Sequence, residues 1–265
     1  MMQHVTSQTG IAFKEIGSGD PVVFIHGFCG SHAYWKSIEH LLESHMKAYY
    51  IDLPGHGASK EMPYASLEDY VELLRKWKEE MGIKKMTLIG HSLGGYLTLA
   101  YADKYPQDLS GYSLIHSTAF PDSDEGKEGR EKGIQTIESQ GIEKFIDGLI
   151  PKLFDGNFKK QHPETIEEAK AIGFQTEPKQ AIRFLKAMRD RKDRRKMLTD
   201  STIPHLLVAG ETDEVVPSYK TFIGGSTAAT EKLLTETAHM SMYEQPEELS
   251  KVIVQWLTSV KQVSI

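Results

Sequence analysis

The chain has 265 residues, of which 39% are hydrophobic and 26% are charged, and its formal net charge is −6. This composition is typical of a globular protein with a sizeable core, and the mildly acidic balance gives no reason to expect a nucleic-acid partner. The single cysteine, Cys29, excludes an internal disulfide and fits a reducing compartment.

The N-terminal segment shows no signal-peptide pattern, with no charged stretch followed by an apolar one. The longest apolar stretches have the length of strands, far below the ~20 residues of a membrane span. We therefore expect a cytoplasmic protein with no membrane partner.

The first 117 residues alternate between strand and helix patterns. Short apolar runs that end at Gly, Pro or Ser predict strands at residues 11–17, 21–27, 46–51, 84–90 and 111–117. Apolar residues at helical spacing between these runs predict helices at 31–45, 66–82 and 93–106. Strands that alternate with helices indicate βαβ units and a mainly parallel sheet.

The pattern changes between residues 118 and 196, where helical patterns occur without a convincing strand. Strand and helix patterns resume at 203–217, 231–236 and 246–260. An insertion of this length is too long for a plain loop. We therefore expect residues 1–117 and 197–265 to form an α/β core, and residues 118–196 to form a helical cap over the carboxyl edge of the sheet. Within that insertion, residues 122–133 are expected to be a mobile, solvated lead-in to the cap.

Residues 88–95, LIGHSLGG, contain the pattern G-x-S-x-G between a predicted strand and a predicted helix. This is the setting of a nucleophile elbow, a tight turn that holds the serine hydroxyl clear of the sheet. Gly90 and Gly94 remove side chains that would collide with the neighbouring elements. Ser92 would also lie at a helix N-terminus, where negative charge is favoured. A glycine-rich turn without catalytic function remains the alternative for this motif alone.

A serine hydroxyl needs a general base, and the base needs a carboxylate that orients it. His239 follows the strand pattern near residue 233, and Asp213, Glu211 and Glu214 follow the strand pattern near residue 207. His116 ends another predicted strand and is an alternative base, although we expect it to line the pocket or support the site from behind.

Acyl transfer creates a tetrahedral oxyanion that needs fixed N–H donors. One donor would be the backbone N–H of Leu93, directly after the serine. The other would be the N–H of Phe28 in the loop HGFCG, residues 26–30, where Gly27 allows a close approach of the backbone. Phe28 would also form a wall of the acyl pocket.

The apolar positions of the cap helices are candidates for the substrate pocket. Together with Phe28 and His116, the expected lining residues are Ile142, Phe145, Ile146, Phe184 and Met188. The run RFLKAMRDRKDRRK, residues 183–196, is strongly basic. We expect it to be the solvated face of an amphipathic helix, with an anionic-substrate or nucleic-acid surface as the alternative.

Five segments, VVFIHGF, DLPGHGAS, LIGHSLGG, AGETDEVVP and AHMSMYEQP, occur in this order along the chain. In these motifs the chain resembles the α/β-hydrolase superfamily over about residues 1–117 and 197–265, and LIGHSLGG is similar to the carboxylesterase and lipase-like branch. The resemblance implies a sheet flanked by helices, and a triad of Ser92, Asp213 and His239 with no metal and no organic cofactor. It favours Asp213 among the three acids because the acid precedes a Val-Val-Pro turn. Epoxide hydrolases and haloalkane dehalogenases carry an aspartate where this chain has Ser92.

The function expected from these features is hydrolysis of a small or medium carboxylic ester, with the small-molecule ester as the partner. Thioesters, lactones, C–C bonds and perhydrolysis are alternatives that use the same triad. A ligand receptor without turnover and a scaffold that binds an acidic partner are alternatives of other classes. The sequence makes no prediction of oligomeric state.

Overall fold

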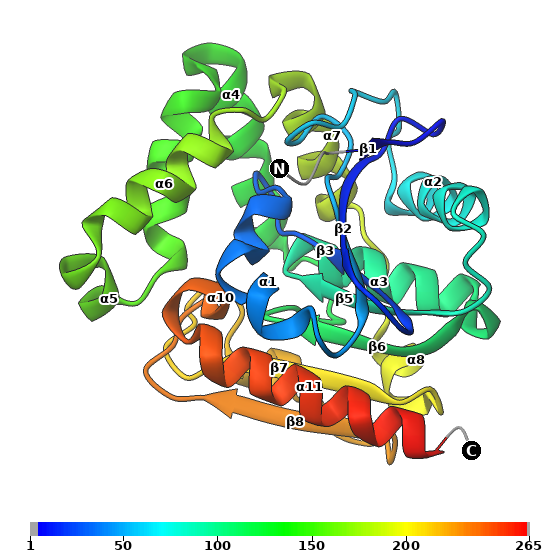
Figure 1. Cartoon of the computed structure of the whole chain (residues 1–265). Coiled ribbons are helices and arrows are strands. Elements are labelled where there is room, and N and C mark those ends of the chain that lie inside the picture. Colours follow the sequence, from blue (N-terminus) through cyan, green and yellow to red (C-terminus); the bar gives the residue numbers. More distant parts are fainter. Residues whose placement is uncertain (1–4, 264–265) are drawn as a thin grey trace.

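The computed structural model describes residues 5–263 of the chain (Figure 1). Within this range eight strands form one sheet in the order β1-β2-β4-β3-β5-β6-β7-β8. The strands are β1 (Val5–Thr6), β2 (Ala12–Gly17), β3 (Pro21–Ile25), β4 (Lys47–Ile51), β5 (Met86–His91), β6 (Leu109–Ile115), β7 (His205–Gly210) and β8 (Ala229–Leu234). β2 pairs antiparallel with β1 and β4, and all pairs from β4 to β8 are parallel. The predicted α/β class and mainly parallel sheet are confirmed; β1 was not predicted.

Helices cover both faces of this sheet. On one face α1 (Lys36–Leu42) packs against α11 (Pro246–Val263), and Figure 1 shows both in front of the sheet. α2 (Leu67–Glu80) packs against α3 (Leu93–Lys104), which contacts β3, β5 and β6. Every residue of β5 and β7 is buried. Burial on both faces explains why these strands read as almost continuous apolar runs.

Between β6 and β7 the chain forms helices instead of strands. They are α4 (Asp124–Leu149), α5 (Gly156–Gln161), α6 (Pro163–Gly173), α7 (Pro178–Arg189) and α8 (Arg195–Asp200). α4 packs against α7 and α6, and Figure 1 shows α4 to α6 beyond one end of the sheet. The short helices α9 (Ser218–Thr221) and α10 (Ser241–Glu244) follow β7 and β8.

Two expectations for the inserted region hold only in part. Residues 122–133 are mostly exposed, as expected, but they are not an irregular lead-in, because Ser123 caps α4 through the Gly126 N–H and most of the segment forms the first turns of that helix. The basic run 183–196 is solvated only in part. Arg191 and Arg194 have side chains that are 5% and 6% exposed, and both form ion pairs.

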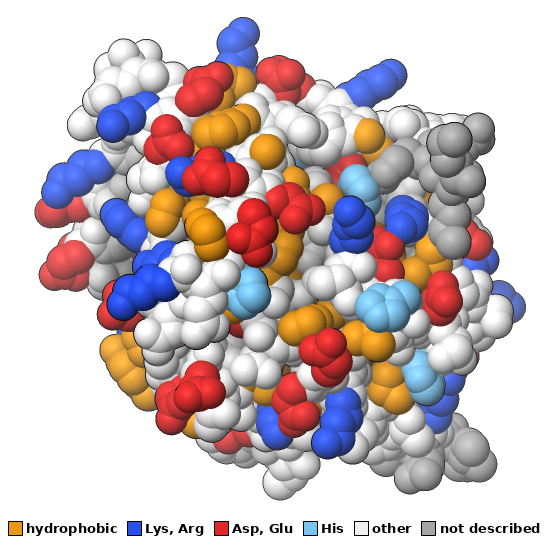
Figure 2. Space-filling view, turned by 60° about the vertical axis from the view of Figure 1, so that its left-hand side comes forward, with side chains coloured by type: hydrophobic (Ala, Val, Ile, Leu, Met, Phe, Trp, Pro, Cys, Tyr) orange, Lys and Arg blue, Asp and Glu red, His pale blue; other side chains and the backbone are white. Residues whose placement is uncertain are grey.

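Acidic and basic side chains are interspersed on the face of the molecule in Figure 2, and the hydrophobic side chains there are scattered in small groups. None of the helices in the described range is both long and apolar enough to cross a membrane.

Candidate active site

Ser92 lies in a tight turn between β5 and α3. Its backbone has a φ of 50° and a ψ of −112°, a left-handed conformation that costs free energy in a residue other than glycine. The turn leaves no room for neighbouring side chains. A Cβ on Gly94 would lie 2.2 Å from the carbonyl oxygen of Ile25, and a Cβ on Gly90 would lie 2.3 Å from that of Gly94. The glycines of the motif are therefore required by the close approach of α3 to β3 and β5.

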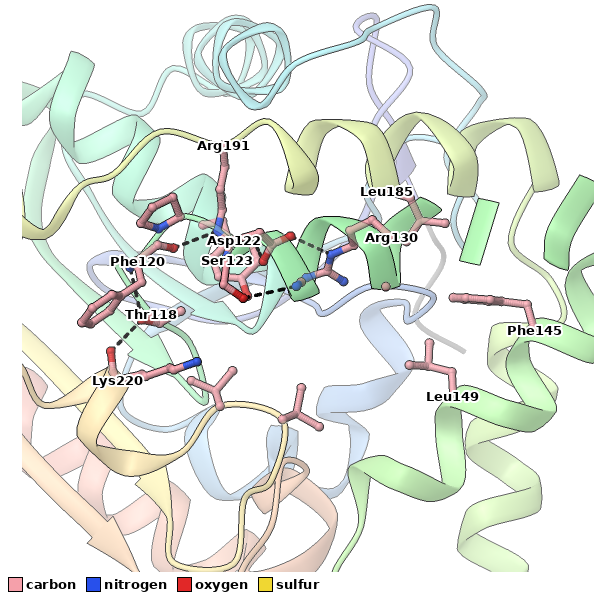
Figure 3. Close-up of a pocket in the computed structure, with 16 residues that line it drawn as sticks. Thr118, Phe120, Asp122, Ser123, Arg130, Phe145, Leu149, Leu185, Arg191 and Lys220 are labelled. Atoms are coloured by element: carbon pink, nitrogen blue, oxygen red, sulfur yellow. Dashed lines mark hydrogen bonds and ion pairs between the residues drawn. The ribbon is translucent and has the colours of Figure 1, made fainter. Parts of the chain in front are cut away.

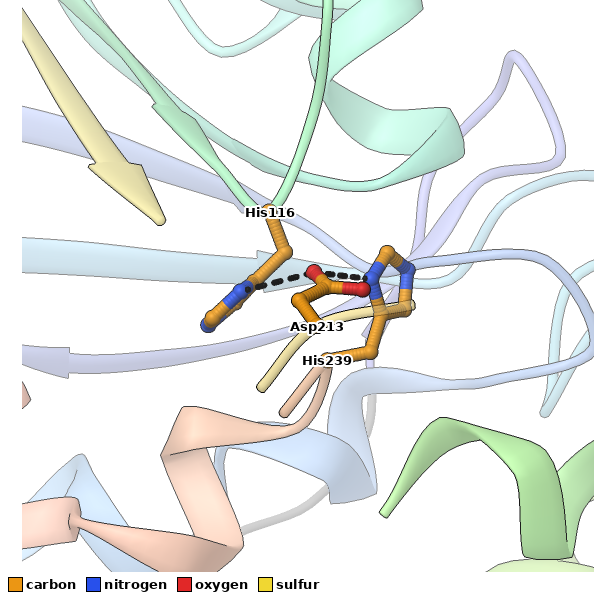
Figure 4. A group of neighbouring side chains, drawn as sticks. All are labelled: His116, Asp213 and His239. Atoms are coloured by element: carbon orange, nitrogen blue, oxygen red, sulfur yellow. Dashed lines mark hydrogen bonds and ion pairs between the residues drawn. The ribbon is translucent and has the colours of Figure 1, made fainter. Parts of the chain in front are cut away.

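The loops after β7 and β8 bring Asp213 and His239 together (Figure 4). The Nδ1 atom of His239 lies 2.8 Å from Oδ2 of Asp213, so it donates its proton to the carboxylate. The other carboxylate oxygen accepts the N–H groups of Val215 and Val216, both at 2.9 Å. The Nε2 atom of His239 is then left as the basic nitrogen. Ser92 and His239 line the same small cavity.

His116 contacts the same carboxylate from the other side. Its Nδ1 donates to Oδ2 of Asp213 at 3.2 Å, and its Nε2 accepts the Ser241 hydroxyl at 2.8 Å. Burial raises the pKa of Asp213, but its electrostatic interactions and hydrogen bonds with His239 and His116 outweigh burial and hold that pKa well below its usual range. Burial lowers the pKa of His116, which keeps this ring neutral. His116 is fully buried and supports Asp213 rather than lining the cavity at Ser92.

His116, Asp213 and His239 are also the one group of described residues whose side-chain atoms are close enough to hold a metal ion, within 4.8 Å of one another. Hydrogen bonds within the group already use the Nδ1 atoms of both histidines and one oxygen of Asp213. A metal ion bound there would have to replace both of these bonds.

The loop of residues 26–30 lies directly against the serine. A Cβ on Gly27 would be 2.6 Å from Nδ1 of His91 and 3.4 Å from Cβ of Ser92. Phe28 lines the cavity at Ser92, and Leu93 begins α3. The two backbone groups that we expect to hold an oxyanion therefore belong to segments that meet at the serine.

Two buried histidines support this loop from behind. Both lie in segments that carry the family resemblance, but no pattern in those segments predicts their hydrogen bonds. His26 donates from Nδ1 to the Gly27 carbonyl at 2.7 Å and accepts the Leu53 N–H on Nε2 at 2.9 Å. His56 accepts the Cys29 N–H on Nε2 at 3.3 Å and donates from Nδ1 to the carbonyl two residues earlier at 2.9 Å. Each ring uses one donor and one acceptor, which only the neutral form has. Burial lowers the pKa of His26 to about 4 and that of His56 to about 3.

Glu244 joins the loop of His239 to the inserted helices. Its Oε2 accepts the N–H groups of Ala238 at 3.0 Å and Met240 at 3.2 Å, on either side of His239. Its Oε1 accepts the N–H of Asp155 at 2.6 Å, at the start of α5. One carboxylate therefore fixes the catalytic-histidine candidate relative to the helices above it.

The cavity at Ser92 has a volume of about 60 Å³. Phe28 and Met188 line it, as expected from the sequence. Tyr34, which the sequence leaves open between a core and a pocket position, also lines it, and the sequence analysis missed the remaining lining residues, which are His91, Tyr96, Arg130, Leu149, Leu153 and Val215. These residues come from five separate segments, and no local pattern signals their convergence.

The other pocket candidates lie elsewhere. Phe145 lines a neighbouring cavity and packs edge-on against Phe28, with ring centroids 5.9 Å apart. Ile142 and Ile146 are buried in the core, 4% and 0% exposed. Phe184 is fully buried with its ring stacked on that of Tyr70. These three do not line the cavity at Ser92, because helical spacing identifies a buried face without saying what that face packs against.

The matching family model and the similar solved structures agree on one fold. A family model described as the alpha/beta hydrolase fold matches residues 20–137. A thermophilic esterase from Thermogutta terrifontis has a similar structure, with a TM-score of 0.90 and 28% identity, covering 97% of this chain and 99% of that one. An enol-lactonase from Burkholderia xenovorans shares the fold, with a TM-score of 0.88 at 18% identity, and covers 97% of this chain and 100% of that chain.

The curated relatives in sequence are longer than this chain, and only part of each relative aligns with it. The Abhydrolase domain-containing protein abhd-5.2 of Caenorhabditis elegans is 34% identical over 146 residues, which cover 50% of this chain and 33% of the relative. The dihydrolipoyllysine-residue acetyltransferase component of the acetoin cleaving system of Pseudomonas putida is 26% identical over 246 residues, covering 90% of this chain and 64% of the relative. The chain thus spans between one third and two thirds of the length of these relatives.

The neutral histidines behind residues 26–30 predict an acid-sensitive fold. An unfolded histidine has a pKa of about 6.5, so below that pH the unfolded chain takes up protons that folded His56 does not. The stability contributed by its low folded-state pKa is complete above about pH 6.5 and is lost as the pH falls toward about 3. We expect urea unfolding of His56→Gln, which keeps an acceptor but does not titrate, to show a pH slope shallower than wild type by up to about 1.4 kcal/mol per pH unit below about pH 6.

Other groups that titrate in this range contribute equally to both proteins. One is Glu244, whose pKa burial raises to about 7 against the opposing effect of its N–H partners. The exposed His45→Gln is the matched control and leaves the slope unchanged. Equal slopes for wild type and His56→Gln would show that His56 is not held neutral.

Glu244→Ala removes the acceptor of three N–H groups. We expect the free energy of unfolding to fall by about 1–3 kcal/mol, measured by urea unfolding, whereas the exposed Glu247→Ala changes it by a few tenths. A Glu244→Ala protein as stable as the Glu247→Ala control would mean that Glu244 does not hold these segments together.

Proposed function

The chain belongs to the α/β-hydrolase superfamily, and on that premise we propose that it is a serine hydrolase that cleaves small to medium carboxylic esters through an acyl-enzyme. The observation that carries the proposal is the bond of 2.8 Å between His239 Nδ1 and Asp213 Oδ2, in a site where His239 and Ser92 line one cavity. The similarity to an esterase over nearly the whole chain supports this substrate class.

In the proposed mechanism, Nε2 of His239 takes the proton of the Ser92 hydroxyl as its oxygen attacks the ester carbonyl. The carbonyl electrons move to the oxygen, and the N–H groups of Phe28 and Leu93 stabilise that oxyanion. His239 then protonates the leaving alcohol as the C–O bond breaks. Water attacks the acyl-enzyme by the same route and releases the acid. Asp213 remains ionised and stabilises the imidazolium.

His116 supports this mechanism without touching the substrate. Its Nδ1–H gives Asp213 a second donor, so the carboxylate stays oriented while His239 gains and loses a proton. Because burial lowers its pKa, His116 does not compete as a second cation.

We also propose that residues 118–196 act as a cap. Arg130, Leu149, Leu153 and Met188 come from this region and line the cavity at Ser92. A cap in this place would exclude bulk water from the acyl-enzyme and shape the pocket around the substrate.

Hydrolysis of p-nitrophenyl esters from acetate to decanoate tests the proposal. We expect wild type to turn over, and Ser92→Ala and His239→Ala to lower kcat by about 10⁴-fold or more, because triad residues act as a unit. The exposed Ser139→Ala and His45→Ala are matched controls and retain wild-type rates.

Full activity of Ser92→Ala would place the nucleophile elsewhere and contradict the mechanism. A wild type that is inert on every ester but is labelled at Ser92 by a fluorophosphonate would retain the nucleophile and exclude ester hydrolysis. Thioesters and lactones would then be assayed with the same variants.

A further inference from the structure

A second cavity of about 330 Å³ adjoins the one at Ser92 (Figure 3). The two cavities share four lining residues, Tyr96, Arg130, Leu149 and Val215. A substrate whose reacting carbonyl lies at Ser92 can therefore extend its other end into the second cavity.

The charge of the second cavity is opposite to that of the protein as a whole. Three basic side chains line it, Arg130, Arg191 and Lys220, against one acidic side chain, Asp122. The chain has a formal net charge of −6. A concentration of positive charge around a cavity in an acidic protein favours an anionic ligand.

The Arg191 side chain is occupied by contacts within the protein. Its Nη1 lies 2.6 Å from Oδ1 of Asp122, its Nε donates to the Phe120 carbonyl at 3.0 Å, and its guanidinium lies over the ring of Tyr96 at 4.2 Å. Its side chain is 5% exposed. Arg191 therefore already balances Asp122 and closes one wall of the cavity.

Arg130 has donors to spare. Its Nε lies 3.0 Å from Oδ2 of Asp122, and neither of its Nη atoms forms a hydrogen bond with any residue in the range 5–263. Its side chain is 26% exposed, and it is one of the residues common to both cavities. Figure 3 shows it between Asp122 on one side and Phe145 and Leu149 on the other.

We propose that Arg130 binds a carboxylate of the substrate, so that the preferred substrates are esters with a free carboxylate at the far end of a short apolar chain. A guanidinium presents paired N–H donors that match a carboxylate. Phe145, Leu149 and Leu185 line the same cavity and suit the methylene groups between ester and carboxylate. The inference rests on the proposed function, because it takes Ser92 as the residue that attacks the ester.

The test compares acid esters with neutral esters of equal chain length: mono-p-nitrophenyl adipate against p-nitrophenyl hexanoate, and mono-p-nitrophenyl suberate against p-nitrophenyl octanoate. We expect Arg130→Met to lower the ratio of kcat/KM for each acid ester to kcat/KM for its matched neutral ester by about 10- to 100-fold. Arg130→Lys restores part of the loss because it keeps the charge but not the paired donors. Because Asp122 also bonds Arg191, we expect both variants to retain the local fold.

Lys127→Met is the matched control. Lys127 lies on the same helix and its side chain is 49% exposed, so the variant changes the net charge equally without touching the cavity. It leaves the ratio of acid-ester to neutral-ester kcat/KM at the wild-type value. A fall of the same size in Lys127→Met, or an equal effect of Arg130→Met on both ester classes, would overturn the carboxylate site.

A second measurement separates this inference from the proposed function. If wild type hydrolyses none of these esters, calorimetric titration of adipate into wild type and Arg130→Met tests the site alone. Binding to wild type that weakens about 10-fold or more in Arg130→Met supports the carboxylate site even though the esterase proposal fails. Equal binding, or no binding to wild type, overturns it.

Discussion

The close approach of α3 to β3 and β5 is the constraint on which the rest of the site depends. It leaves no space for a side chain at Gly94 and forces Ser92 into a left-handed conformation. Hydrogen bonds hold the Ser92 backbone on both sides: its N–H donates to the Ile115 carbonyl, and its carbonyl accepts the Ser117 hydroxyl and the N–H groups of Gly95 and Tyr96. A parallel sheet gathers the carboxyl ends of its strands at one edge, so the loops after β7 and β8 reach the same place as Ser92.

Neutral histidine side chains are the second feature on which the structure around Ser92 depends. His91 illustrates it, because its Nε2 donates to the His239 carbonyl at 2.8 Å and burial keeps its pKa well below the usual value. His26 and His56 each bond two backbone groups beside the serine, whereas His116 bonds the side chains of Asp213 and Ser241. A neutral ring offers one donor and one acceptor in a rigid plane, so it can join two backbone segments without placing a charge in the core. His239 differs from these rings in that it lines the cavity at Ser92.

Much of the core could be predicted from the sequence because it follows from local patterns. Apolar runs of strand length, helical spacing between them and a glycine-flanked serine each have a physical meaning within a few residues. Patterns of the same kind predict that the inserted helices exist, but they do not predict how these helices pack. The periodicity of Ile142, Ile146 and Phe184 identifies buried faces, but a core and a cavity bury a helix face in the same way.

The charged positions were the hardest to predict. Residues 122–133 contain several glycines and many charges, which suggested a mobile, solvated segment. Most of these residues are exposed, but the Ser123 cap begins α4 there, and Asp122 just before it forms ion pairs with Arg130 and Arg191. The proposed role of Arg130 follows only from its position in the lining of the cavity. Whether a charged side chain on a helix is solvated or functional depends on which residues lie beside it in the folded protein. These neighbours can be far apart in sequence, as Arg191 and Asp122 are, at a separation of 69 residues.

The sizes of the two cavities suit different roles, with the reaction at the small cavity and the choice of substrate at the large one. About 60 Å³ at Ser92 holds only a few atoms beyond the reacting carbonyl, since one water needs about 10–15 Å³ on the same scale. On the proposed mechanism, a larger group of the substrate would therefore extend into the neighbouring cavity of about 330 Å³. Ser92, Asp213 and His239 come from the ends of sheet strands, whereas Arg130, Phe145 and Leu185 come from the inserted helices. On the proposed mechanism the sheet performs the reaction and α4 to α7 decide what is attached to the ester, so substrate preference can change through those helices while the strand ends that carry the reaction stay as they are.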